Sequence, residues 1–405
     1  MKKLFLVFMF FVGAVGFVVF EWLAISPYVG AKLIANGCFA HAANGQSKKM
    51  ALSDVEKATQ SAILMEANTG TVLFEKNSDK KLPMASMTKL MTIALVLDEI
   101  DAGRLNESQL VEVSAYAASQ TGSEAFLDSK DRYSLADLIR TTIIVSANDS
   151  AMALAELVGG SESGFVLKMN QKAKEMGLVG THFENPTGLP AAGHFSCARD
   201  IAVLAKDVVV HPIYRKYSKI YLDELVHPSG RKTQLVNTNR KFRNYNGFEG
   251  GKTGHTNEAG YCFSAVANRG DMRLVAVVFG AANSENRFDA TKAMFDFGFE
   301  NFKTKDVVRA DKLICKAAVE YGKIARIRLF AKEGFCVFLP ADEKPEFEIE
   351  TSVNKLWAPV LEGEVCGHLK VLKDKKVIFE TDLVAGEGCN HIGYKKVIKS
   401  LIDKF

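Results

Sequence analysis

The chain has 405 residues, which is long for one domain and favours two. Hydrophobic residues make up 48% and charged residues 24% of the sequence, close to ordinary globular proteins, so a disordered chain is excluded. The formal net charge of +4 is small, and Lys and Arg cluster clearly only at the C-terminus. We therefore expect no nucleic-acid partner.

The first residues have the pattern of an export signal. Lys2 and Lys3 precede an uncharged apolar run of about 17 residues from Leu4 to Phe20. This pattern is typical of a secretory signal peptide or an N-terminal membrane anchor, and a buried core helix is the alternative. A small-x-small cleavage pattern lies unusually far from the run, so the choice between signal and anchor stays open for residues 1–42. Either one predicts that the rest of the chain is exported, to the periplasm or the outer face of the membrane.

The chain has seven cysteines, none of them in a Cys-x-x-Cys pair. Export permits disulfides, and if cleavage removes Cys38 the remaining six cysteines allow fifteen full pairings. No cluster of His and Cys has the spacing of a metal site, so we expect neither a metal nor another cofactor. The seven are Cys38, Cys197, Cys262, Cys315, Cys336, Cys366 and Cys389.

Residues 50–302 combine helical and strand patterns. Apolar runs around an Asn/Gly turn predict a hairpin at 63–74. The stretch 87–98 is apolar nearly all round and predicts a buried helix, and a capping box opens a second helix at 135–146. Helices beside an antiparallel sheet make an α+β domain. Further helices are predicted at 150–159, 161–176, 196–209 and 286–299, and strands at 250–254, 261–268 and 273–280.

Two further segments follow this domain. Short β-prone runs separated by turns predict a small all-β domain at 303–385. In the last segment, 390–405, apolar residues recur at three- and four-residue spacing with lysines between them. That pattern predicts a basic amphipathic helix that anchors the protein to a membrane surface, and the alternative is a terminal helix docked on the protein itself.

Three short motifs occur in an informative order. Ser-x-x-Lys alone is a poor signal because it occurs four times, but only Ser86 opens an apolar helix. Ser146-Ala147-Asn148 lies at a break between two helices, and Lys252-Thr253-Gly254 occurs once, at the start of a strand. Penicillin-binding proteins and class A β-lactamases carry this motif set. The four Ser-x-x-Lys copies are Ser78/Lys81, Ser86/Lys89, Ser229/Lys232 and Ser352/Lys355.

The residue types suit nucleophilic catalysis. A serine hydroxyl attacks only when a base takes its proton, and at this helical spacing Lys89 lies on the same face as Ser86. A lysine is a base only when neutral, and burial together with a second cation such as Lys252 lowers its pKa. We expect Ser146 to relay a proton to the leaving amine, and Asn148 to hold both Lys89 and a substrate amide.

The Lys252 segment suits substrate binding. Lys252 and Thr253 offer a charge and a hydroxyl to a substrate carboxylate, and Gly254 leaves room for a peptide along the strand edge. The backbone N–H groups of Ser86 and His255 form a possible oxyanion hole. Each residue alone is more simply a helix cap, a loop residue or a surface charge. The ordered set favours the catalytic interpretation.

In their contexts these motifs resemble the low-molecular-mass penicillin-binding proteins, which are serine-type D-alanyl-D-alanine carboxypeptidases. The resemblance is carried by 81–92, 145–150, 184–190 and 251–262, and it covers the chain from about residue 50 to the end. It implies a catalytic domain of the penicillin-binding and β-lactamase fold. It also implies that Ser86 forms the acyl-enzyme with Lys89 as base, and that Arg287 supports carboxylate binding. Ala147 and Cys197 depart from the usual Gly and Thr.

The sequence therefore predicts an exported, membrane-attached hydrolase that removes the terminal D-Ala from peptidoglycan stem peptides ending in D-Ala-D-Ala. β-Lactam antibiotics are expected to acylate it. The alternatives are a β-lactamase, a D,D-endopeptidase acting on crosslinks, and a non-catalytic cell-wall binding protein. The all-β domain and the predicted membrane segment argue against the β-lactamase, and the complete motif set argues against the binding protein.

Overall fold

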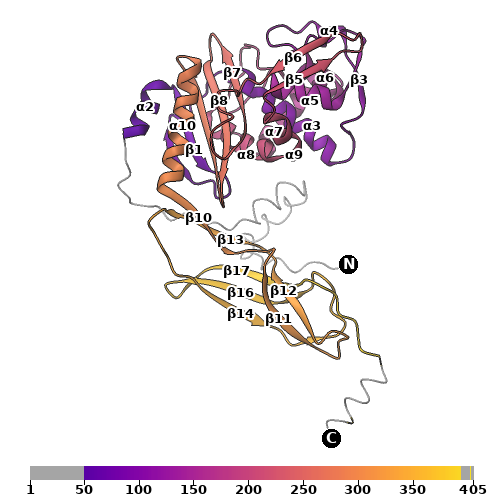
Figure 1. Cartoon of the computed structure of the whole chain (residues 1–405), viewed down its shortest axis with the longest axis vertical. Helices are drawn as coiled ribbons and strands as arrows, with labels where there is room; N and C mark the ends of the chain where they lie inside the picture. The colour runs from indigo at the N-terminus through magenta and orange to yellow at the C-terminus, as the bar shows by residue number, and fades with distance from the viewer. Residues whose placement is uncertain (1–49, 394–401, 403–405) are drawn as a thin grey trace, which may run out of the picture.

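The computed structural model describes residues 50–393 and residue 402. The predicted export segment 1–42 and most of the predicted amphipathic helix at 390–405 lie outside these residues. Within the described part, no helix is both long and apolar enough to cross a membrane. The described chain forms an α+β domain followed by an all-β domain (Figure 1), which confirms the predicted order of the two fold types.

The α+β domain is built on an antiparallel five-stranded sheet with the order β2-β1-β9-β8-β7. Helices α10 and α2 cover one face and α8 covers the other (Figure 1). Strand β1 contributes side chains to the hydrophobic cores on both faces of the sheet. Ile63 packs in the core on the α8 side, and Leu64 packs in the core on the α10 side. Strand β7 is an edge strand, so one row of its backbone groups faces away from the sheet. The elements are α2 (Met50–Ala58), β1 (Ser61–Glu66), β2 (Val72–Lys76), α8 (Ala198–Val210), β7 (Phe248–Thr256), β8 (Gly260–Arg269), β9 (Met272–Ala281) and α10 (Ser284–Asn301).

A group of helices, with the short strands β3 and β4, lies beside the β7 edge (Figure 1). Helix α3 passes through this group, and its first nine residues, from Lys89 to Leu97, are buried. The predicted capping box is confirmed, because the Ser134 hydroxyl accepts the N–H of Asp137 at 3.1 Å. The group consists of η1 (Ala85–Thr88), α3 (Lys89–Asp101), β3 (Leu110–Glu112), α4 (Ala115–Ala118), β4 (Arg132–Ser134), α5 (Leu135–Ile144), α6 (Asn148–Gly159), α7 (Glu162–Glu175) and α9 (Pro212–Ser218).

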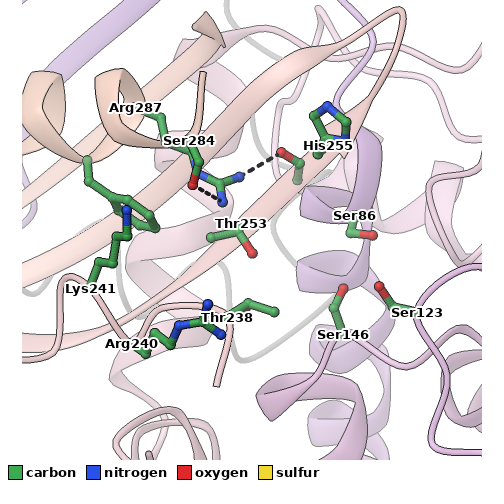
Figure 2. A pocket seen from close by; sticks show the side chains of 12 residues that line it. Ser86, Ser123, Ser146, Thr238, Arg240, Lys241, Thr253, His255, Ser284 and Arg287 are labelled. Carbon is green, nitrogen blue, oxygen red and sulfur yellow. Dashed lines mark hydrogen bonds between the residues drawn. The ribbon is translucent and has the colours of Figure 1, made fainter. Parts of the chain in front are cut away.

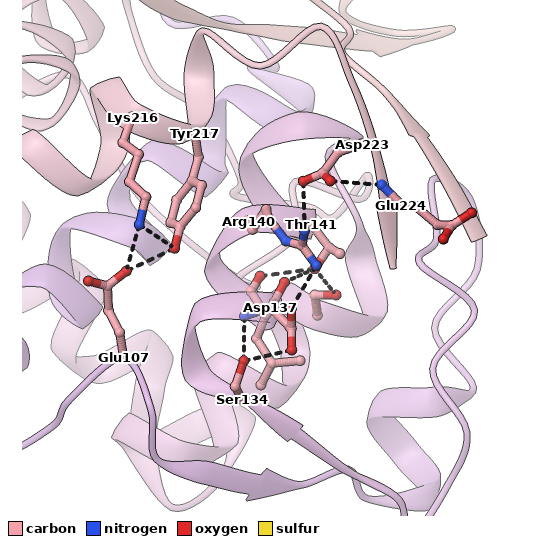
Figure 3. A network of polar contacts seen from close by, with 11 residues as sticks. Glu107, Ser134, Asp137, Arg140, Thr141, Lys216, Tyr217, Asp223 and Glu224 are labelled. Carbon is pink, nitrogen blue, oxygen red and sulfur yellow. Dashed lines mark hydrogen bonds and ion pairs between the residues drawn. The ribbon is translucent and has the colours of Figure 1, made fainter. Parts of the chain in front are cut away.

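Polar contacts fasten a hairpin to helix α5 (Figure 3). Arg140 of α5 donates one hydrogen bond to Asp223 and another to Asp137, each at 2.7 Å. Beyond the hairpin, the N–H of Thr238 donates to the carbonyl of Ile144 at 3.1 Å. The residues after the hairpin are thereby held against the end of α5. The hairpin strands are β5 (Leu222–Val226) and β6 (Lys232–Val236).

The all-β domain begins directly after α10. Its main sheet has six strands in the order β14-β16-β17-β12-β11-β15, and β10 pairs with β13 in a second, two-stranded sheet. Strand β12 alternates as a one-sided strand should, with Ile327 and Leu329 buried and Arg326 and Arg328 exposed. The strands are β10 (Phe302–Val308), β11 (Leu313–Glu320), β12 (Arg326–Ala331), β13 (Phe335–Pro340), β14 (Glu348–Val353), β15 (Leu356–Trp357), β16 (Val365–Lys373) and β17 (Lys376–Ala385).

Some element boundaries differ from the sequence predictions. A 3₁₀ turn occupies residues 85–88, so the α-helix predicted from Met87 begins only at Lys89. Helix α5 ends at Ile144, because Ser146 adopts a left-handed φ of +65° that no helix accommodates. Short helix α9 and the β5–β6 hairpin were not predicted individually.

The cysteines are not fully paired. Five of the described cysteines carry free thiols, which excludes each of the fifteen full pairings of six cysteines that the sequence left open. Burial raises the pKa of the Cys197 thiol and of the Cys262 thiol to about 11 in each case, which keeps both in the unreactive neutral form. The five free cysteines are Cys197, Cys262, Cys315, Cys366 and Cys389.

Candidate active site

Ser86 lies in the 3₁₀ turn that leads into α3, and the backbone of this turn is constrained. Ala85 has a φ of +48°, a left-handed value that costs an alanine on the order of 1 kcal/mol. Two glycines allow other segments to approach. A Cβ on Gly188 would lie 2.0 Å from the Ala85 carbonyl oxygen, and a Cβ on Gly254 would lie 2.8 Å from the Met84 oxygen. Strand β7 and the loop that ends at Gly188 therefore press directly on the turn that carries Ser86.

Lys89 is buried directly behind Ser86. Its side chain is 1% exposed, and its Nζ donates to Ser86 Oγ at 3.0 Å, to Asn148 Oδ1 at 2.6 Å and to the Thr187 carbonyl at 2.6 Å. Burial, with the nearby charge of Lys252 as a second cause, lowers the pKa of Lys89 well below its ordinary value. A lysine with a lowered pKa, in contact with a serine hydroxyl, is able to act as a base.

The predicted break between two helices places two further polar side chains, those of Ser146 and Asn148, in the cleft. Ser146 takes its left-handed φ of +65° in the connection between α5 and α6. Asn148 begins α6, is buried, and donates from Nδ2 to the Thr121 carbonyl at 2.6 Å while its Oδ1 accepts from Lys89. Protein contacts therefore orient both ends of the Asn148 amide.

Lys252 lies on β7, opposite the helix break. Its Nζ donates to Ser146 Oγ at 2.8 Å and to the Thr253 carbonyl at 3.0 Å, and the side chain is 1% exposed. Burial first, and then the charge of Arg287, lower the pKa of Lys252 to about 7. The two lysines thus hold the two serine hydroxyls, Lys89 that of Ser86 and Lys252 that of Ser146.

Basic side chains predominate among the buried ionisable groups around the cleft. Lys89, Lys252 and Arg287 are buried there, and burial also lowers the pKa of Arg287. Asp149 is buried beside Asn148, but its carboxylate accepts three backbone N–H groups, those of Ala125, Leu127 and Ser150. Because much of the Asp149 charge is used by these bonds, the cleft favours an anionic ligand.

A pocket of about 330 Å³ opens over these groups (Figure 2). The figure shows Ser86, Ser146 and Ser123 on one side and Arg240 and Lys241 on the other. The pocket brings together several of the residues predicted from the sequence. His255 also lines it, and its exposed side chain lies against Tyr261, with ring centroids 4.1 Å apart. The lining residues are Ser86, Ser123, Ser146, Thr238, Arg240, Lys241, Thr253, Gly254, His255, Ser284, Arg287 and Phe288.

The two pocket arginines differ in their contacts. Arg287 donates to the carbonyls of Gly254 at 3.1 Å and Cys262 at 3.3 Å, and to Ser284 Oγ at 3.2 Å. It therefore braces the β7–β8 pair that carries Gly254. Arg240 makes no side-chain hydrogen bond or ion pair with the residues that the structure describes, although it lines the pocket. Arg240 is the better placed of the two to bind an incoming anion directly.

Several pocket residues were not predicted from the sequence. Thr238, Arg240 and Lys241 follow the β5–β6 hairpin, and only the tertiary contacts of that hairpin bring them to the cleft. Ser123 arrives from the long loop after α4, where its carbonyl accepts the N–H of Asn148 at 2.6 Å. A motif search has no signal for these positions.

A second unpredicted group supports the nucleophile turn from behind. The Thr88 hydroxyl donates to the Ala85 carbonyl at 2.8 Å and lies 2.7 Å from His194 Nε2. His194 Nδ1 accepts the N–H of Glu184 at 2.9 Å, so the proton of the neutral ring lies on Nε2 and is donated to Thr88. Burial, followed by the charges of His182 and Lys89, lowers the pKa of His194 to about 4 and keeps the ring neutral.

Comparison with known proteins agrees with this geometry. Residues 47–283 match the family model of D-alanyl-D-alanine carboxypeptidases, and residues 302–390 match that of the C-terminal domain of penicillin-binding protein 5. The carboxypeptidase DacF of Bacillus subtilis (strain 168) is 37% identical over 366 residues, which is 89% of this chain and 93% of the relative.

Solved structures give the same result. Penicillin-binding protein 5 from Haemophilus influenzae aligns with a TM-score of 0.65 and 29% identity, over 87% of this chain and 100% of that one. Penicillin-binding protein D2 from Listeria monocytogenes, solved in the ampicillin-bound form, aligns with a TM-score of 0.51 and 31% identity, over 60% of this chain and 98% of that one. The chain therefore belongs to the D-alanyl-D-alanine carboxypeptidases, a family of serine hydrolases.

Proposed function

We propose that this carboxypeptidase releases the terminal D-Ala of peptidoglycan stem peptides through an acyl-enzyme on Ser86. The observation that carries the proposal is the contact of 3.0 Å between Ser86 Oγ and the buried Nζ of Lys89, whose pKa is lowered. Neutral Lys89 takes the Ser86 proton while Oγ attacks the carbonyl of the penultimate D-Ala. The backbone N–H groups of Ser86 and His255 receive the developing negative charge.

The remaining steps follow from the same contacts. The tetrahedral intermediate expels D-Ala as an amine. Ser146, held by Lys252 at 2.8 Å, passes its proton to that amine and receives the proton of the Lys89 ammonium in exchange, so that Lys89 is neutral again. A water molecule then attacks the Ser86 ester and loses one proton to Lys89, which returns it to Ser86 Oγ when the acyl product leaves. Asn148 holds the substrate amide, and its contact with Lys89 keeps that lysine in place.

Substrate binding uses the free edge of β7. A peptide laid along this edge adds a strand to the sheet, which suits a substrate recognised through its backbone. Its terminal carboxylate lies near the hydroxyl of Thr253 and the charges of Lys252 and Arg240. Gly254 lets β7 pack directly on the turn that carries Ser86. Arg287 acts indirectly, because its Nη1 and Nη2 groups donate to the carbonyls of Gly254 and Cys262 and to Ser284 Oγ.

Inhibitors and location complete the proposal. A β-lactam presents a carboxylate and a reactive carbonyl to the same groups, and the ampicillin-bound Listeria relative supports this interpretation. The apolar run near the N-terminus and the lysine-rich segment after residue 393 support export and attachment to the outer face of a membrane. Against a β-lactamase, the twelve residues that line the pocket include no Asp or Glu to activate a deacylating water.

The test combines two reagents on the purified full chain. Fluorescent penicillin and a pentapeptide ending in D-Ala-D-Ala are each incubated with wild-type protein and with Ser86→Ala. We expect a stable covalent label and D-Ala release from the wild type, and neither from the variant. Absence of both from the wild type contradicts the proposal. Fast penicillin turnover without D-Ala release identifies a β-lactamase. If a crosslinked peptide dimer, added as a third substrate, is split while the pentapeptide releases no D-Ala, the enzyme is an endopeptidase.

A further inference from the structure

An apolar patch lies at the point where the described all-β domain ends. Strand β15 pairs with the end of β11, where Trp357 lies opposite Glu320. The N–H of Ile392 donates to the Tyr321 carbonyl at 2.8 Å, and Val360 pairs with Cys389. These bonds join three segments, 319–324, 355–361 and 389–392, at one end of the domain. We call the apolar side chains on them the tip patch, defined as Tyr321, Ile324, Trp357, Pro359 and Leu361.

The tip patch faces outward in a regular pattern. From 356 to 361 buried and exposed residues alternate, so Trp357, Pro359 and Leu361 point away from the core while the residues between them are buried. Trp357 is 53% exposed, Leu361 70% and Ile324 39%. Tyr321 is stacked on Trp357, with ring centroids 5.7 Å apart. Large apolar side chains gathered on a surface mark an interaction site more often than scattered ones do.

Two observations bear on which kind of partner suits the tip patch. The chain leaves the domain at this place and continues as segment 394–405, which carries four lysines among apolar residues. At the patch itself, Lys355 Nζ lies 4.7 Å from the centre of the Trp357 ring. Tryptophan and tyrosine beside lysine is the composition that proteins present to the boundary between lipid headgroups and acyl chains.

We propose that the tip patch inserts into the headgroup region of a lipid bilayer, next to the C-terminal segment. The inference rests on the proposed membrane attachment and deepens it, because the folded domain then supplies a second contact. Acidic residues balance the lysines here, since Glu320 lies opposite Trp357, and the carboxylate of Glu364 accepts the N–H of Leu361. The patch therefore contributes to membrane binding through burial of its apolar side chains. This contribution should persist at salt concentrations that screen the charges of the lysines.

The tryptophan content of the chain gives a direct probe. Only Trp22 and Trp357 occur, so Trp22→Phe leaves one fluorophore, located in the tip patch. The full chain carrying this substitution is mixed with phosphatidylethanolamine–phosphatidylglycerol vesicles, with and without brominated acyl chains. We expect a blue shift of the Trp357 emission and strong quenching by the brominated lipid.

A matched probe tests whether the effect is local. Ile349 is 49% exposed on β14, the opposite edge of the six-stranded sheet. A chain with Trp22→Phe, Trp357→Phe and Ile349→Trp therefore carries its fluorophore on the same domain but away from the patch. We expect this emission to stay unshifted and unquenched. Joint substitution of Trp357→Ser and Leu361→Ser should weaken vesicle partitioning about tenfold or more, and Leu313→Ser with Ile349→Ser should not.

Each other outcome contradicts the inference. Co-sedimentation with vesicles while Trp357 stays unshifted means that the protein is attached without the patch, so the inference falls and membrane attachment stands. If the protein does not co-sediment with vesicles at all, both the inference about the patch and the proposed membrane attachment are contradicted. If Trp357 is blue-shifted without vesicles and red-shifts when 394–405 are deleted, the C-terminal segment covers the patch instead. D-Ala release from a soluble peptide should be equal in all these variants, which separates this test from that of the catalytic function.

Discussion

The active-site cleft and the all-β domain bury different kinds of side chain. In the cleft, Lys89 and Lys252 are each 1% exposed and Arg287 is 9% exposed. In the all-β domain, the buried side chains of the described residues are apolar apart from Thr381. Burying an ionisable side chain costs free energy and adds little to stability. The buried basic side chains of the cleft therefore indicate a chemical role, whereas the interior of the all-β domain is explained by stability alone.

The backbone shows the same difference. In the cleft, left-handed φ values occur at Ala85, next to the nucleophile, and at Ser146, where a helix is interrupted. In the all-β domain, positive φ occurs at Tyr321, in the turn after β11, and at Asp374 and Lys375, which form the two-residue turn between β16 and β17; such values are normal in hairpin turns. Positive φ indicates a functional constraint in the first case and an ordinary hairpin in the second.

The largest effect is expected when the buried lysine loses its amine. Lys89→Met removes the base from Ser86, and acylation by penicillin and D-Ala release should fall by roughly 10²–10⁴-fold. The matched control is Lys355→Met, the exposed lysine of another Ser-x-x-Lys copy, in the all-β domain. It should leave both rates on soluble substrates unchanged. Equal losses in the two variants would show that burial does not distinguish the two lysines.

Sequence patterns predicted the all-β domain well, because each of its strands can be recognised from a short run of neighbouring residues. The β-prone runs at 325–330 and 335–339 correspond to strands β12 and β13. In the cleft, the motifs correctly selected the residues that hydrogen bonds join, Ser86 to Lys89 and Ser146 to Lys252. The order of the three motifs identified these residues. Ser-x-x-Lys alone could not do so, because it occurs four times in the chain.

Other parts of the cleft depend on contacts that the sequence does not encode locally. His194 supports the nucleophile turn from more than a hundred residues away in the chain, through Thr88. Arg240 lines the pocket from the segment after the β5–β6 hairpin, and contacts of Arg140 and Ile144 hold the hairpin and this segment against α5. Ala85 adopts its left-handed φ where Gly188 and Gly254 pack closely against the backbone of its turn. No pattern in the local sequence predicts this conformation.

The second prediction tests whether the two regions are independent. Leu369 is fully buried in the core of the all-β domain. Leu369→Ala should lower the free energy of unfolding of that domain by about 2–5 kcal/mol, measured in urea, because it leaves a cavity. D-Ala release from a soluble peptide in the absence of urea should remain at the wild-type rate. A parallel loss of activity would show that the catalytic domain depends on the integrity of its neighbour.

The third prediction concerns pH. The pKa of Lys252 is lowered to about 7, so its amine is charged below that pH and neutral above it. If the charge binds the substrate carboxylate, kcat/KM should fall by up to about tenfold per pH unit above roughly pH 7. Lys252→Arg should move this decline to higher pH, because arginine stays protonated. An unchanged decline in the variant, or in a peptide with an amidated C-terminus, would assign it to another group.

The smallest effect is expected from the support behind the nucleophile. Thr88→Val removes the hydroxyl that donates to the Ala85 carbonyl and accepts from His194, and acylation should slow about five- to tenfold at unchanged KM. Thr381→Val is the matched change in the all-β domain, where that hydroxyl accepts the N–H of Glu333. Both variants should lose a similar amount of stability, about 1–2 kcal/mol, but only Thr88→Val should slow acylation. If stability falls in both and the acylation rate in neither, Thr88 and His194 serve folding alone, and the strained turn needs no support from them during catalysis.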